Sequence, residues 1–78
     1  MEITIENFIT HFKNQLLDEN EEVLATTDYV NESYWDSLTS MVIKVMIEDE
    51  YSLSIDKTDL NSFSSINDLF DYIKEKSK

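Results

Sequence analysis

The chain has 78 residues without cysteine, glycine or proline, and its 17 acidic residues against six basic ones give a net charge of −11. The missing cysteine excludes disulfides, thiolate metal sites and a thiol nucleophile, and the missing glycine and proline disfavour all-β folds with many tight turns. The charge repels nucleic acids and anionic membranes and favours basic protein partners, although it also fits a solubility function or a nucleic-acid mimic.

The length fits one small domain, residues 1–78, and 41% hydrophobic content is enough for a single core. No apolar run approaches the roughly 18–20 residues of a membrane span. The acidic start, MEITIENF, lacks the basic region of a secretory signal. We therefore expect a cytoplasmic protein, monomeric at this charge, with no nucleic acid or membrane as a partner.

The first helix is predicted from Thr4 to Leu17. Its apolar residues recur at helical spacing, and they are Ile5, Phe8, Ile9, Phe12 and Leu16. Thr4 is expected to cap the helix, and Glu6 suits the positive end of the helix dipole. His11 lies beside the apolar stripe without a second ligand at metal spacing, so we expect a solvated side chain and no metal site.

A long loop is predicted from Asp18 to Trp35, because its many Asn, Asp, Ser and Thr side chains compete for backbone hydrogen bonds. Its apolar residues are expected to pin it to the core, and they are Val23, Leu24, Tyr29 and Val30. The acidic run Asp18–Glu22 lacks the glycine and the spacing of a calcium loop, which predicts a solvated turn. Trp35 is expected to be a packing anchor, with a recognition role as the alternative.

The second helix is predicted from Ser37 to Tyr51, and its apolar residues fall into two arcs on a helical wheel. The arc expected to face the core contains Ile43, Met46, Ile47 and Tyr51. The other arc contains Leu38, Met41, Val42 and Val45, flanked by Asp36, Glu48 and Asp49. We predict that this second arc is a partly exposed docking surface, and the alternative is a helix buried on nearly all sides.

The C-terminal part is predicted to contain a short helical turn at Lys57–Asn61 and a last helix that begins near Ser65. Ser65 and Asp68 have the spacing of a capping box. The apolar face of this helix contains Ile66, Leu69, Phe70 and Ile73, and the lysines at its end are Lys74, Lys76 and Lys78. The sequence thus predicts an all-α fold, a small four-helix bundle of three main helices and one short helix.

Ser37 follows a broken segment and precedes a helical run, so it is predicted at the N-cap or at the first position of the second helix. A serine there commonly caps the helix, a contribution on the order of 1 kcal/mol. The same position offers unpaired N–H groups and a positive dipole end, which also suit a phosphate attached to the serine oxygen.

The motif Asp36-Ser37-Leu38, which opens an apolar, acid-flanked helix midway along the chain, resembles that of the acyl carrier proteins of the stand-alone type. YVNESYWDSL is similar to the family's approach to its serine, IEDEYSLSI to the acidic end of its second helix, and FSSINDLFDYI to its last helix. The resemblance spans nearly the whole chain. Ser33-Tyr34 replaces a common Leu-Gly pair, and Lys44 replaces a common aliphatic residue.

The resemblance implies a carrier without catalytic residues of its own, with 4′-phosphopantetheine joined to Ser37 as a phosphodiester between Asp36 and Leu38. Acyl groups are then held as thioesters for fatty-acid, polyketide or related biosynthesis, and aminoacyl cargo stays open. The implied partners are a phosphopantetheinyl transferase that uses coenzyme A and magnesium, and acyl-transferring, ketosynthase or ligase enzymes with basic docking patches. The alternative is an acidic helical adaptor or nucleic-acid mimic that binds a basic protein without modification. A hydrolase is disfavoured because the sequence offers no nucleophile–base pair.

Overall fold

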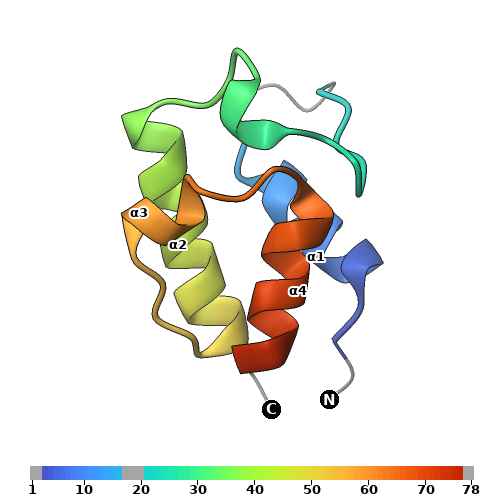
Figure 1. Cartoon of the computed structure of the whole chain (residues 1–78), viewed down its shortest axis with the longest axis vertical. Helices are drawn as coiled ribbons and strands as arrows, with labels where there is room; N and C mark the ends of the chain where they lie inside the picture. The colour runs from blue at the N-terminus through green and yellow to red at the C-terminus, as the bar shows by residue number, and fades with distance from the viewer. Residues whose placement is uncertain (1–2, 17–20, 77–78) are drawn as a thin grey trace.

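Figure 1 shows a computed structural model that describes residues 3–16 and 21–76. The elements are α1 (Ile5–Asn14), the 3₁₀ turn η1 (Tyr29–Asn31), α2 (Ser37–Tyr51), α3 (Lys57–Leu60) and α4 (Ile66–Lys76). Over the described ranges no strand is found, and no helix is both long and apolar enough to span a bilayer. The predicted all-α bundle of three main helices and a short one is confirmed.

Most of the helix boundaries agree with the prediction to within one residue. α2 has the predicted bounds, and Thr4 caps α1 by accepting a hydrogen bond from the N–H of Asn7. α1 ends at Asn14, earlier than predicted, because the next two N–H groups bond to carbonyls three residues back and tighten the last turn. The predicted end at Leu17, most of the acidic run (residues 18–20) and Lys78 lie outside the described residues.

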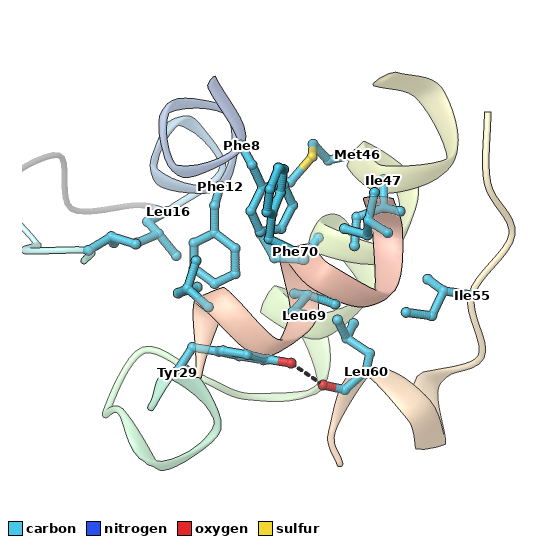
Figure 2. Packing of buried hydrophobic residues seen from close by; sticks show 14 residues of the cluster. Phe8, Phe12, Leu16, Tyr29, Met46, Ile47, Ile55, Leu60, Leu69 and Phe70 are labelled. Carbon is cyan, nitrogen blue, oxygen red and sulfur yellow. Dashed lines mark hydrogen bonds between the residues drawn. The ribbon is translucent and has the colours of Figure 1, made fainter. Parts of the chain in front are cut away.

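The core is built from one face of each helix and from the segments before and after α2. Its buried members are Phe8, Phe12, Leu16, Val23, Tyr29, Ile43, Met46, Ile47, Ile55, Leu60, Ile66, Leu69, Phe70 and Ile73. In Figure 2, Phe8 of α1 lies against Phe70 of α4, with ring centroids 5.9 Å apart. Truncating such a buried aromatic residue to alanine typically costs about 3–5 kcal/mol.

The loop from residue 21 onward is bonded to the start of α4. The N–H groups of Ile66 and Asn67 donate to the carbonyls of Thr27 and Ala25, at 3.0 and 2.8 Å. Ser65 caps the same helix as predicted, since its Oγ accepts from the N–H of Asp68. The first turn of α4 is therefore occupied by the chain's own carbonyl and hydroxyl groups.

The prediction that four apolar side chains pin this loop is wrong for Leu24. Val23 and Tyr29 are buried and Val30 is half-buried, but Leu24 is 51% exposed. Leu24 opens a turn in which its N–H and carbonyl both bond to Thr27. The hydrogen bonds of this turn hold the backbone of Leu24 to Thr27, and its side chain stays in solvent.

Candidate functional site

Two hydrogen bonds tie the loop before α2 to the end of α3. The Tyr29 hydroxyl donates to the carbonyl of Leu60, a bond drawn in Figure 2. The Trp35 ring N–H donates to Oδ1 of Asn61 at 2.6 Å. Trp35 also stacks on Phe12, with ring planes 5° apart, so the prediction of a packing anchor is confirmed. These contacts fix the position at which α2 begins.

Asp36 caps α2. Its backbone is extended, and its Oδ1 accepts from the N–H of Thr39 at 2.7 Å while its carbonyl accepts from the N–H of Ser40. The hydrogen bond from the Thr39 N–H lowers the pKa of the Asp36 carboxyl below its ordinary value. Of the two positions predicted for Ser37, the N-cap and the first helical position, the second is confirmed, because Asp36 takes the capping conformation.

Ser37 is the first helical residue, and its side chain is exposed. Its carbonyl accepts a hydrogen bond from the Ser40 hydroxyl at 3.0 Å, whereas its own hydroxyl has no hydrogen bond to the rest of the described chain. The start of α2 therefore presents a serine hydroxyl to solvent, at the positive end of a 15-residue helix.

The two arcs of α2 have the predicted environments. Ile43 and Ile47 are fully buried, Met46 is 5% exposed, and Tyr51 is half-buried against the core. On the other side, Leu38 is 64% exposed, Met41 55% and Val45 48%, while Val42 is half-buried. The alternative of a helix buried on nearly all sides is wrong. We call Leu38, Met41, Val42 and Val45 the apolar strip.

The last turn of α2 carries Glu48, Asp49 and Glu50 and no basic residue. Carboxylates at the C-terminal end of a helix are unfavourable for the helix dipole, so their position is not explained by helix stability. Glu48 forms an ion pair with Lys44, with Nζ 2.7 Å from Oε2. Asp49 forms no ion pair with any residue that the structure describes.

His11 was predicted to be solvated, but its side chain is only partly exposed and contacts α2. Its Nε2 lies 3.8 Å from Oε2 of Glu50, and its ring meets the Tyr51 ring edge-on at 6.2 Å. In residues 3–16 and 21–76, no group of three or more acidic, histidine or cysteine side chains could hold a metal ion.

A groove of about 280 Å³ runs between the end of α1 and the exposed side of α2. It is lined by Gln15, Met41, Val42, Val45, Met46, Asp49 and Glu50. The strip residues were predicted to be exposed, but Gln15 and Glu50 were not assigned to the site. Glu50 could have been found, because residues 42, 46 and 50 follow each other at intervals of four. Gln15 gives no such signal, because its place depends on how α1 packs.

A family model for the phosphopantetheine attachment site matches residues 8–73. The matched segment begins in α1, ends in α4 and contains the whole of α2 with Ser37 and the apolar strip. Comparisons with curated proteins and with solved structures find no match.

Proposed function

This chain belongs to the family with a phosphopantetheine attachment site, and on that basis we propose that it is an acyl carrier protein modified on Ser37. Proteins of this family are non-catalytic carriers that hold 4′-phosphopantetheine covalently on a serine. The observation that carries the proposal is the exposed Ser37 side chain at the start of α2, beside the apolar strip, and its hydroxyl has no hydrogen bond to the residues that the structure describes. We propose fatty-acid, polyketide or related biosynthesis as its pathway.

The residues around Ser37 fit a phosphodiester. In the proposed modification, Ser37 Oγ bonds to phosphorus of coenzyme A, its proton leaves, and the anhydride P–O bond breaks to release adenosine 3′,5′-bisphosphate. Asp36 directs one carboxylate oxygen to the Thr39 N–H, so part of its charge is already neutralised. The arm, when attached, supplies a thiol that holds an acyl group as a thioester.

The apolar strip and the nearby carboxylates support docking to enzymes. Exposed apolar side chains provide contact area, and the carboxylates of Asp36, Glu48 and Asp49 attract basic patches and orient them, with the contribution of Glu48 reduced by its ion pair with Lys44. The proposed partners are a phosphopantetheinyl transferase and acyl-transferring, ketosynthase or ligase enzymes with basic patches.

Intact mass tests the proposal. The chain is incubated with coenzyme A, magnesium and a broad-specificity phosphopantetheinyl transferase, beside Ser37→Ala and Ser33→Ala. Ser33 is a matched control because it is also exposed and lies four residues before Ser37. The parent chain and Ser33→Ala should gain one phosphopantetheine group, and Ser37→Ala should gain none. A folded parent chain without the gain, in a reaction that modifies a known carrier, would favour the acidic adaptor instead.

A further inference from the structure

Lys44 lies on α2 between Ser37 and the acidic residues of the last turn, Glu48, Asp49 and Glu50. It is the only basic residue of α2. Seven residues make nearly two helical turns, so Lys44 projects within about 20° of the direction of Ser37 and about 10 Å along the axis. Glu48 follows one turn later, about 20° to the other side. The ion pair between them therefore lies on the face that carries Ser37.

Helix stability does not explain this ion pair. An i,i+4 pair is more favourable with the acidic residue first, and here the lysine comes first. The side chains are 31% and 34% exposed, and pairs accessible to solvent contribute little to stability. The larger effect of Lys44 is on the surface charge, since it cancels Glu48 close to Ser37.

The other carboxylates near Ser37 have different surroundings. Glu50 lies near His11 on the groove side, and Asp36 is bonded to the start of α2. Asp49 projects about 120° from the direction of Ser37 and forms no ion pair within the described part of the chain. The carboxylate most available to a basic partner, that of Asp49, thus lies to one side of the Ser37 direction, whereas the charge-neutral pair of Lys44 and Glu48 lies along it.

We propose that Lys44 is a specificity-determining residue for the partners of this carrier. By holding Glu48 in an internal ion pair, it disfavours enzymes whose docking patch places a cation opposite Glu48. It favours enzymes with a neutral or acidic group opposite Lys44. Such a residue acts mainly by penalising the wrong partners, which is a common source of specificity. This inference rests on the proposed function, since it concerns the enzymes that act on Ser37.

The kcat/KM for modification by a broad-specificity phosphopantetheinyl transferase tests the proposal, at low and high ionic strength. Lys44→Gln releases Glu48 and should raise kcat/KM roughly threefold to tenfold at low salt, with a smaller gain at high salt. Lys74→Gln on α4 is the matched control, because it changes the net charge equally on an exposed residue of another helix. It should change kcat/KM by less than about twofold.

The double substitution Lys44→Glu with Glu48→Lys provides a second test that keeps the pair and the net charge. It places the acidic residue first, so the helix should be at least as stable, as circular dichroism can show. Because the cation then occupies position 48, modification should become slower than in the parent chain. Equal rates for Lys44→Gln and Lys74→Gln, or an unchanged rate for the double substitution, would overturn the proposal. A parent chain that is not modified at all would instead contradict the proposed function.

Discussion

Two tyrosines in the loop before α2 allow one hydrogen bond to be tested against a matched control. Tyr29 is fully buried, and its hydroxyl donates to the carbonyl of Leu60. Tyr34 is half-buried, and its hydroxyl oxygen is buried without a hydrogen-bond partner in the described chain. Burial raises the pKa of both phenols, to about 12 in Tyr34, so both are protonated at neutral pH.

The substitutions Tyr29→Phe and Tyr34→Phe should therefore have different effects. Tyr29→Phe leaves the Leu60 carbonyl without its donor and should lower the free energy of unfolding by about 1–3 kcal/mol. Tyr34→Phe removes an oxygen that is already unpaired, so stability should stay unchanged or rise by up to about 1 kcal/mol. For a domain of this size, 1 kcal/mol corresponds to a change in Tm of about 4–8 °C.

Urea unfolding followed by far-ultraviolet circular dichroism measures both changes. The slope against urea should be equal in the three proteins, so that the midpoints report stability alone. If Tyr34→Phe lowered the free energy of unfolding as much as Tyr29→Phe, the reasoning would be refuted. A Tyr29→Phe variant as stable as the parent chain would show that the hydrogen bond to Leu60 contributes little to stability.

Three further predictions follow from α2 and its ends. Ser52 ends the helix at φ 52° and ψ 38°, a left-handed conformation in which glycine is favoured. Ser52→Gly should therefore raise the free energy of unfolding by about 0.5–1 kcal/mol, as measured by urea unfolding. Ser52→Ala is the control and should not raise it. The lowered pKa of Asp36 stabilises the folded chain above the ordinary value of 3.8, and this contribution is lost as the pH falls through the folded value. Asp36→Asn should therefore weaken the acid dependence of Tm, and an identical dependence would contradict this. Glu48→Lys with Asp49→Lys should slow modification by the transferase, most at low salt, and unchanged kinetics would remove the steering argument.

Much of the fold could be predicted because its determinants are local. The two arcs of α2 follow from helical periodicity, and the Ser65 cap follows from spacing. The cap of α2 could not be assigned, since Asp36 and Ser37 can both cap and only the backbone shows which is extended. The exposure of Leu24 depends on a turn that sequence patterns do not define.

The ionic contacts of the site also differ in how far the sequence predicts them. The Lys44–Glu48 pair joins residues four apart on one helix, so sequence can suggest it. The approach of His11 to Glu50 joins two helices and depends on how α1 packs against α2. The groove beside Gln15 depends on the same packing. The apolar strip was predictable, but its neighbours on α1 were not.

Trp35, the single tryptophan of the chain, has a practical consequence. It lies two residues before Ser37, stacked on Phe12 and hydrogen-bonded to Asn61. Indole fluorescence responds to the polarity and hydrogen bonding around the ring, so the molecule contains an optical reporter beside its site. Attachment of a group to Ser37, or the approach of an enzyme, should alter the emission without any added label. Binding and loading can thus be followed in real time on the unaltered chain.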